Sequence, residues 1–231
     1  MIGWILGQRC GTSSLAKALY EQGFPLSEPL DTRIFQNVQP EGHYENVFAR
    51  DWNRKLMANF KVTAVQPGLL PFLKWDVLSG WLAREPADFI VKDPQLAFVW
   101  PVWLRTLREM PGHDAALCAV WCRRDFGQQV TSLQKYRISE EDAAYCVNMY
   151  EACAAASAKF IPTLEVWLDD PDRVAKAAQF FRSHGLTEDA GAVIQRQQKD
   201  ARREVSPPVA TATGDNDESA APVAAAASAA A

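Results

Sequence analysis

Two hydrophobic patterns alternate along this chain. Short, almost continuous apolar runs are typical of buried β-strands, and they occur at residues 2–6, 88–91, 115–122 and 163–167. Apolar residues that recur every three or four positions indicate amphipathic helices, and they occur at residues 12–22, 45–60, 75–85, 126–136, 139–160 and 170–185. Strands that alternate with helices predict an α/β fold, in which helices cover both faces of a mostly parallel sheet.

Single residues mark where several of these helices begin and end. Pro94 suits the first turn of a helix, and we expect Pro101 to restart or kink it. Ser139 is a good N-cap for the long helix that follows it. Gly185 suits the end of the next helix. We also expect a last, polar helix over about residues 187–204.

The C-terminal segment differs in composition from the rest of the chain. From Val205 to Ala231 it contains no aromatic residue, Leu or Ile, and it closes in an Ala/Ser run. Such a segment buries too little apolar surface to offset the entropy that is lost on ordering. We therefore expect one globular domain over residues 1–204 and a disordered, Ala-rich tail over residues 205–231.

The charge of the chain narrows the classes of partner. The 24 Lys and Arg residues and the 28 Asp and Glu residues give a net charge of −4. This balance provides no general basic surface for nucleic acid or for an anionic membrane, so we expect neither partner. Because no run of 18 uninterrupted apolar residues is present, we expect no membrane span. The oligomeric state stays open.

The cysteines favour a cytoplasmic location. The chain has five, an odd number, with no CxxC pair and no signal peptide before them. This pattern predicts reduced thiols and no metal site. We expect four of them to be small buried hydrophobic residues. Cys10 is the expected exception because it lies in a loop.

The residues with the most interesting chemistry follow the predicted strands. Arg9 to Ser14 come after the first strand, Lys92 to Pro94 after the second, and Arg123 and Arg124 after the third. The carboxyl ends of parallel strands meet at one edge of a sheet, and ligands of such folds bind there. We expect these three segments to form one site.

The loop from Gly7 to Ser14 is similar to a nucleotide-binding P-loop but departs from it. The Walker A pattern is G-x-x-x-x-G-K-[ST], whereas Gly7 and Gly11 are four residues apart and Thr12 stands where the lysine belongs. The positive charge lies inside the loop instead, at Arg9. Backbone amides at the start of the next helix would still point at an anion. The loop therefore predicts a phosphate or sulfate site without an obvious magnesium arrangement.

At this loop the chain resembles the sulfotransferases that depend on 3′-phosphoadenosine 5′-phosphosulfate (PAPS), which belong to the P-loop superfamily. Their first loop reads K/R-S-G-T-[ST] and holds the 5′-phosphosulfate, and residues 9–13 follow it with Cys10 in place of serine. In a second motif, an arginine at a strand end and a serine eight residues later hold the 3′-phosphate. Arg124 and Ser132 have this spacing.

Two more motifs resemble a bacterial branch of the same family. The pattern G-[YHF]-[YF]-E-[NS] before a helix matches residues 42–46. The pattern K-D-P-R-L matches residues 92–96, with Gln95 in place of the arginine. The resemblance covers about residues 2–186, and the order and spacing of the motifs make it more specific than any one of them.

The resemblance implies that the chain moves a sulfuryl group from PAPS to a hydroxyl or amine of a small-molecule or carbohydrate acceptor, without a metal. Arg9 and Lys92 would hold the transferred group, and Glu45 or Asp93 would accept the proton of the acceptor. The residues that would bind the donor are Arg9, Cys10, Gly11, Thr12, Ser13, Ser14, Arg124 and Ser132.

Two assignments within this site stay open. Arg123 competes with Arg124 as the phosphate ligand, because alternation along a strand sends the two side chains opposite ways. Glu45 is the first candidate for the base if it lies away from a cation. Asp93 is its rival, but we expect the adjacent Lys92 to depress its pKa. We assign His43 to a loop rather than to catalysis.

Two other functions compete with the sulfotransferase interpretation. A small-molecule P-loop kinase would depend on Mg²⁺ and would need the Walker lysine that this loop lacks. A non-catalytic nucleotide-binding relative would keep the loop and lose the base. For that alternative, Cys10 and Gln95 are the only indications in the sequence.

Overall fold

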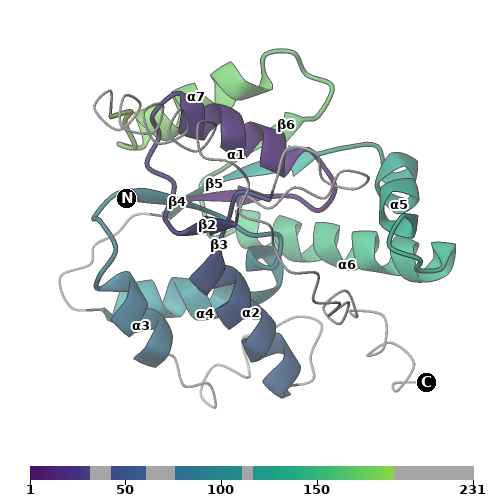
Figure 1. Ribbon diagram of the computed structural model, residues 1–231, viewed down its shortest axis with the longest axis horizontal. Helices are drawn as coiled ribbons and strands as arrows, with labels where there is room; N and C mark the ends of the chain where they lie inside the picture. The colour runs from purple at the N-terminus through teal and green to yellow at the C-terminus, as the bar shows by residue number, and fades with distance from the viewer. Residues whose placement is uncertain (32–42, 61–75, 111–116, 190–231) are drawn as a thin grey trace, which may run out of the picture.

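The computed structural model describes residues 1–31, 43–60, 76–110 and 117–189 (Figure 1). Strands and helices alternate within them, as the hydrophobic pattern predicts. In chain order the elements are β1 (Ile2–Leu6), α1 (Thr12–Glu21), β2 (Leu30–Asp31), β3 (Glu45–Asn46), α2 (Val47–Phe60), α3 (Asp76–Leu82), β4 (Phe89–Lys92), α4 (Leu96–Glu109), β5 (Leu117–Arg123), α5 (Phe126–Gln134), α6 (Glu140–Ala158), β6 (Thr163–Trp167) and α7 (Arg173–Ser183).

The main sheet has four parallel strands in the order β4-β1-β5-β6. β1 lies between two neighbours, so that Trp4 is opposite Val91 on one side and Ala119 on the other. β6 extends the sheet beyond β5, where Arg123 is opposite Trp167. Because all four strands run the same way, the loops after them share one edge of the sheet.

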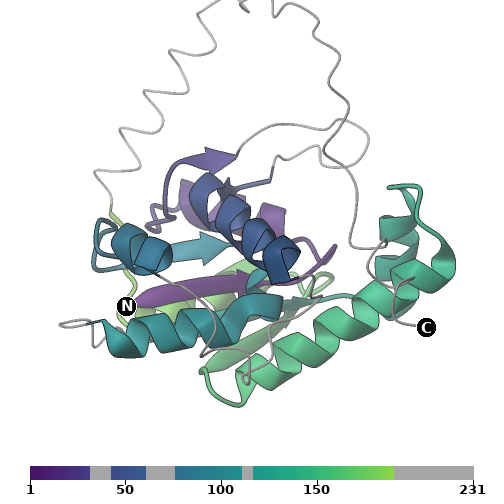
Figure 2. The same cartoon turned by 90° about the horizontal axis from the view of Figure 1, so that it is seen from below.

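Helices cover both faces of this sheet, which confirms the predicted α/β architecture. α1 and α7 pack together on one face, and α4 and α6 lie on the opposite face (Figure 1). Figure 2 shows α4 and α6 beside each other, with α5 packed at the end of α6. α2 and α3 both contact α4. This covering is needed because both faces of a parallel sheet are apolar.

Alternate residues of β1 supply two separate hydrophobic cores. Trp4 points to the face covered by α4, where its ring meets Trp103 edge-on with 5.8 Å between centroids. Ile5 points to the other face and belongs to the core that contains Leu15 of α1 and Phe181 of α7. All five side chains are buried. β1 is therefore fixed from both sides, and the loop after it starts from a fixed point.

A second sheet of two short antiparallel strands is present, which the pattern does not predict. In it Leu30 of β2 is opposite Asn46 of β3, and Asp31 is opposite Glu45. Strands of two residues have no periodicity that a sequence pattern can reveal. β3 also contacts β4 of the main sheet, and it thereby brings Glu45 close to the edge at which ligands bind.

The predicted helix boundaries agree with the structure in part. Ser139 caps α6, since its Oγ accepts a hydrogen bond from the Asp142 amide at 3.0 Å. Pro101 lies inside α4, which continues to Glu109, so it does not restart the helix. The predicted last helix does not begin at Thr187, because residues 187–189 are not helical. Its remainder, the domain boundary and the tail lie outside the described residues.

Candidate functional site

The loops after β1, β4 and β5 lie side by side at the carboxyl edge of the sheet. The register places Ile5 opposite Lys92 and Leu6 opposite Trp121. The loop after β1 therefore begins between the strand end that carries Lys92 and the strand end that carries Arg123. This is the arrangement that the sequence predicts for the three segments.

Two glycines determine the backbone path of the loop after β1. Gly7 has a φ of 142°, and a Cβ there would lie 2.8 Å from the carbonyl oxygen of Cys122. Its N–H donates to the Tyr150 hydroxyl of α6 at 2.6 Å. Gly11 has a φ of 72°, which favours glycine, and a Cβ there would collide with Leu168 Cδ1. The fold itself therefore requires both glycines of the P-loop-like pattern.

The start of α1 has the geometry of an anion site. N-terminal amides of a helix lack partners within it, and the helix dipole favours negative charge there. Gly11 is the N-cap, and no side-chain cap satisfies these amides among the described residues. The hydroxyls of Thr12, Ser13 and Ser14 donate instead to the carbonyl oxygens of Gly7, His43 and Gly11, at 3.4, 3.1 and 2.8 Å respectively.

Cys10 is buried, so the expectation that its loop position sets it apart was wrong. It is 1% exposed, and its thiol donates to the carbonyl oxygen of Gln8 at 3.1 Å. Burial, together with the nearby Glu151 carboxylate, raises the pKa of this thiol to about 12. The side chain packs in the core with Leu15 of α1. A role of Cys10 in donor binding would therefore involve its backbone.

Arg9 reaches from the loop to α5. Its Nε donates to Ser132 Oγ at 2.9 Å, and its Nη1 donates to the Tyr136 hydroxyl at 2.9 Å. The guanidinium carbon lies 5.2 Å from the centroid of the Tyr136 ring, within the range of a cation–π contact. The structure thus brings Arg9 and Ser132, which belong to two different motifs, into direct contact.

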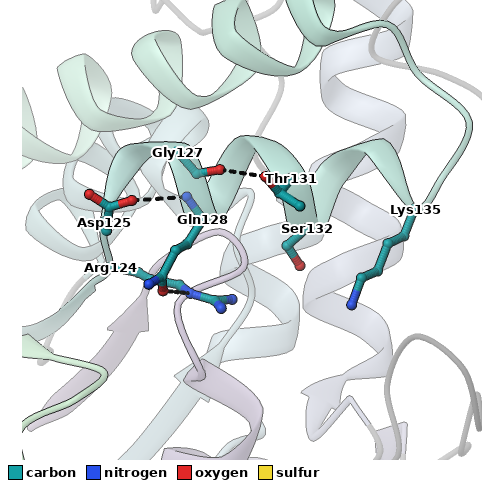
Figure 3. Close-up of a pocket in the computed structure, with 7 residues that line it drawn as sticks. All are labelled: Arg124, Asp125, Gly127, Gln128, Thr131, Ser132 and Lys135. Carbon is teal, nitrogen blue, oxygen red and sulfur yellow. Dashed lines mark hydrogen bonds between the residues drawn. The ribbon is translucent and has the colours of Figure 1, made fainter.

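A hollow of about 300 Å³ lies along α5 next to this contact (Figure 3). Arg124, Gln128, Ser132 and Lys135 point to the same side of the helix, toward the loop after β1. Arg124 Nη1 donates to the Arg9 carbonyl oxygen at 3.4 Å, and Arg124 Nε donates to Gln128 Oε1 at 2.9 Å. The positive charges of Arg124 and Lys135, with the Ser132 hydroxyl between them, suit a phosphate group.

Arg123 is engaged elsewhere, which favours Arg124 as the phosphate ligand. Its Nη1 donates to Glu165 at 2.8 Å, its Nη2 lies 3.1 Å from Glu151, and its guanidinium stacks over Trp121. Alternation along β5 therefore has the expected effect and sends Arg123 away from the loop. Asp125 also lines the hollow, but its carboxylate accepts from the Gln128 amide and caps α5.

Lys92 and Glu45 form a buried ion pair beside the start of α1. The Nζ of Lys92 lies 2.8 Å from Glu45 Oε1 and donates to the His43 carbonyl oxygen at 2.8 Å. The same carbonyl accepts from Ser13, so the pair is tied to the first turn of α1. The Nδ1 of His43 lies 3.7 Å from Glu45 Oε1. The side chain of His43 is 26% exposed, against 5% for Glu45.

The pKa values of the two candidate bases shift in the opposite sense to the expectation. Burial opposes the ionisation of Glu45, but the charge of Lys92 and the contacts with His43 and Lys92 outweigh it and lower its pKa. Burial raises the pKa of Asp93 to about 6, and the charge of Glu45 acts in the same direction. The prediction that Glu45 lies away from a cation was therefore wrong. The charge of Lys92 does act to lower the pKa of Asp93, as expected, but burial and the charge of Glu45 outweigh it, so the expected net depression does not occur.

The reason is the direction of the Lys92 side chain. It extends toward β3 and pairs with Glu45, a residue 47 positions away in the sequence. Asp93 has neutral partners instead: Asn53 Nδ2 donates to its Oδ2 at 2.6 Å, and the Gln95 amide donates to its Oδ1 at 3.0 Å. Adjacency in sequence does not place two side chains on the same side of the backbone.

Two residues at this edge, Lys135 and Tyr136, escaped the sequence reasoning. Tyr136 and Lys135 follow the Ser132 motif by one turn of helix or less, and helical spacing would have placed them near it. His43 was assigned to a loop rather than to catalysis, and the structure places its Nδ1 3.7 Å from Glu45 Oε1. Neither Lys135 nor Tyr136 belongs to the family motifs, which is why they were not singled out, whereas His43 lies within the motif at residues 42–46.

The described residues include neither a metal-binding cluster nor a membrane-spanning helix. Among the described residues, no group of three or more His, Cys, Asp and Glu side chains is placed to hold a metal ion. None of the helices in these segments has both the length and the apolar character needed to cross a bilayer.

Comparisons of the chain with protein-family models, with curated proteins and with solved structures gave no match.

Proposed function

We propose that this chain is a PAPS-dependent sulfotransferase. One observation carries the proposal: the start of α1 and the Arg124–Ser132 surface of α5 lie next to each other. Arg9 Nε donates to Ser132 Oγ at 2.9 Å, and Arg124 Nη1 lies 3.4 Å from the Arg9 carbonyl oxygen. Two adjacent anion-binding surfaces suit a nucleotide that has charged groups on both its 5′ and 3′ positions.

The 5′-phosphosulfate would lie against the first turn of α1. The amides of this turn and the positive end of the helix dipole stabilise negative charge there. Lys92 adds a fixed positive charge close by, since its Nζ and Ser13 Oγ bond to the same His43 carbonyl oxygen. These groups are held in place before any ligand arrives, which is the condition for effective electrostatic catalysis.

The reaction would be an in-line transfer. The acceptor oxygen or nitrogen forms a bond to sulfur while the bond from sulfur to the bridging oxygen of the 5′-phosphate breaks. The acceptor proton passes to a base, and adenosine 3′,5′-bisphosphate leaves with the electron pair of the broken bond. As in phosphoryl transfer, catalysis is then mostly positioning and charge stabilisation.

The proton acceptor would be Glu45, with His43 as its partner. The carboxylate of Glu45 is fixed by Lys92, and its lowered pKa keeps it ionised at neutral pH. The more exposed His43 lies 3.7 Å from it and would contact an acceptor first. A histidine backed by a carboxylate is a common arrangement for moving a proton. Both carboxylates are buried, but Glu45 lies beside the more exposed His43, whereas Asp93 accepts from Asn53 and the Gln95 amide, so Asp93 is the weaker assignment as the base.

Nucleotide binding tests the proposal. Adenosine 3′,5′-bisphosphate should raise the Tm of the full chain, because a ligand that binds only the folded state stabilises it. ATP with Mg²⁺ should raise it less, since the Walker lysine is replaced by Thr12. A larger shift with ATP would favour the kinase and would contradict the sulfotransferase assignment.

Turnover of labelled PAPS with a panel of hydroxyl and amine acceptors tests the catalytic step. Glu45→Gln removes the carboxylate and keeps its shape, so we expect turnover to fall by about 10²–10⁴-fold with little change in bisphosphate affinity. His43→Gln should also lower turnover. Normal turnover in Glu45→Gln, with a folded but inactive Asp93→Asn, would transfer the role of base to Asp93. A wild-type chain that binds bisphosphate and transfers nothing would favour the non-catalytic relative.

A further inference from the structure

The direction of the Arg9 side chain suggests a role for it that differs from the one the loop motif implies. The motif places a cation over the 5′-phosphosulfate, at the start of α1. In the structure the guanidinium turns to α5 instead, where it bonds to Ser132 Oγ and to the Tyr136 hydroxyl at 2.9 Å each. Within the described part of the chain, the ring of Tyr136, whose centroid lies 5.2 Å from the guanidinium carbon, adds to these two hydrogen bonds.

The backbone of Arg9 fits this side-chain placement. Its φ is 60°, in the left-handed region that non-glycine residues rarely adopt. Conformations of this kind persist where surrounding contacts hold them, and they concentrate at ligand-binding loops. The Arg9 carbonyl oxygen is itself a hydrogen-bond acceptor of Arg124 at 3.4 Å. Both the main chain and the side chain of Arg9 are thus attached to the α5 surface.

We infer that Arg9 recognises the nucleoside 3′-phosphate together with Arg124 and Ser132, and that Tyr136 is the positioning residue that holds Arg9 there. The inference rests on the proposed function, because it assigns a ligand group to the same nucleotide site. The transferred sulfuryl group is then held by the α1 amides and by Lys92, without direct help from Arg9.

The charge of the ligand groups supports this division. A phosphate monoester carries close to two negative charges at neutral pH, whereas each group of a phosphosulfate carries about one. Arg124 and Lys135 line the hollow together with Ser132, and Arg9 of the loop after β1 donates to the same Ser132 hydroxyl. Planar guanidinium groups bind phosphate through paired hydrogen bonds, so two arginines suit the more highly charged group.

Tyr136 acts through Arg9. Its hydroxyl accepts a hydrogen bond from Nη1, and its ring lies under the guanidinium. Tyr136→Phe keeps the ring and removes the hydroxyl, so the guanidinium loses one of the contacts that direct it to α5. The expected consequence is weaker binding of the 3′-phosphate alone, because no contact joins Tyr136 to the start of α1 among the hydrogen bonds that the structure shows.

Calorimetric titration of the full chain with adenosine 3′,5′-bisphosphate and with adenosine 5′-monophosphate tests the inference. The ratio of the two affinities isolates the 3′-phosphate. Arg9→Gln should reduce this ratio about tenfold or more, as Arg124→Gln should, and Tyr136→Phe should reduce it about threefold to tenfold. The affinity for the monophosphate should stay within about twofold of wild type in the Arg9 and Tyr136 variants.

Two further variants serve as controls. Tyr145→Phe changes another exposed tyrosine, on α6, and should leave the ratio unchanged. Arg9→Lys keeps the charge and loses the planar fork, so it should reduce the ratio less than Arg9→Gln, and it replaces that variant if Arg9→Gln does not fold.

Each failure has a distinct meaning. A wild-type chain without any preference for the bisphosphate would contradict the proposed function itself. A wild-type preference combined with equal losses for both nucleotides in Arg9→Gln would place Arg9 on the 5′ group and overturn the inference. A Tyr136→Phe ratio equal to wild type would overturn the role of Tyr136.

Discussion

Two carboxylates at the end of β4 and in β3 differ in acidity because their nearest partners differ. Glu45 faces the ammonium of Lys92 at 2.8 Å, whereas Asp93 is enclosed with the neutral side chain of Asn53 at 2.6 Å. Opposite charge stabilises the ionised form of the first, and burial disfavours the ionised form of the second. A pair of groups with separated pKa values is typical of functional sites.

Asp93 should make the stability of the protein depend on pH. Burial raises its pKa from 3.8 to about 6, so the folded state binds this proton more tightly than the unfolded chain. The contribution of Asp93 to the free energy of unfolding is therefore complete below about pH 4 and is lost as the pH rises through about 6. Urea denaturation of wild type and Asp93→Asn between about pH 4 and about pH 7 measures this contribution of Asp93 to the free energy of unfolding.

The difference in unfolding free energy between wild type and Asp93→Asn should be larger at about pH 4 than at about pH 7, with wild type the more stable at low pH. Glu45 has the opposite sign: its lowered pKa gives a contribution that is present above its unfolded pKa of 4.5 and is lost as the pH falls. A difference that stays constant, or that grows toward neutral pH, would show that Asp93 does not hold its proton as described.

At the scale of elements, the site depends on how the loop joins β1 to α1. Gly11 is the N-cap of α1 and has a φ of 72°. We expect Gly11→Ala to lower the free energy of unfolding by about 1 to 2 kcal/mol, because a side chain there is strained in the left-handed region. The added Cβ would also collide with Leu168 Cδ1, so this flexible side chain would have to shift.

Gly80 of α3 provides the matched control for this prediction. Nothing lies within 4 Å of a Cβ built there, and its φ is not in the left-handed region. Gly80→Ala should therefore stabilise the protein by about 0.5 to 1 kcal/mol through helix propensity. Chemical denaturation compares the two variants. Equal effects of both substitutions would mean that the Gly11 conformation is not required by the fold.

At the scale of the whole molecule, we expect the folded part to be independent of the C-terminal tail. From Val205 onward the segment contains no aromatic residue, Leu or Ile, so it offers little apolar surface for docking on the domain. Truncation before Val205 should leave both the Tm and the affinity for adenosine 3′,5′-bisphosphate unchanged. A drop in either quantity, measured against the full chain under the same conditions, would indicate that the tail packs on the domain.

The local pattern was sufficient for the architecture. The apolar run at residues 2–6 and the spacing of Leu15 and Leu19 predicted β1 and α1, and a mostly parallel sheet covered on both faces followed from the alternation of strands and helices. Burial of these side chains needs no distant partner of particular identity, since any apolar surface suffices. The loop glycines and the cap at Ser139 could also be predicted from the sequence, because each depends on the backbone conformation at its own position.

The partners of the charged residues were decided by the tertiary structure. Lys92 pairs with Glu45 rather than with its neighbour Asp93, and Arg9 bonds to Ser132 and Tyr136 rather than lying over α1. Each of these contacts joins residues more than 40 positions apart, brought together by the register of the sheet and the packing of α5. The sequence thus determines which chemical groups reach the carboxyl edge, since strands and loops follow from local pattern. Which of them touch depends on side-chain direction and on non-local packing, and no local pattern encodes either.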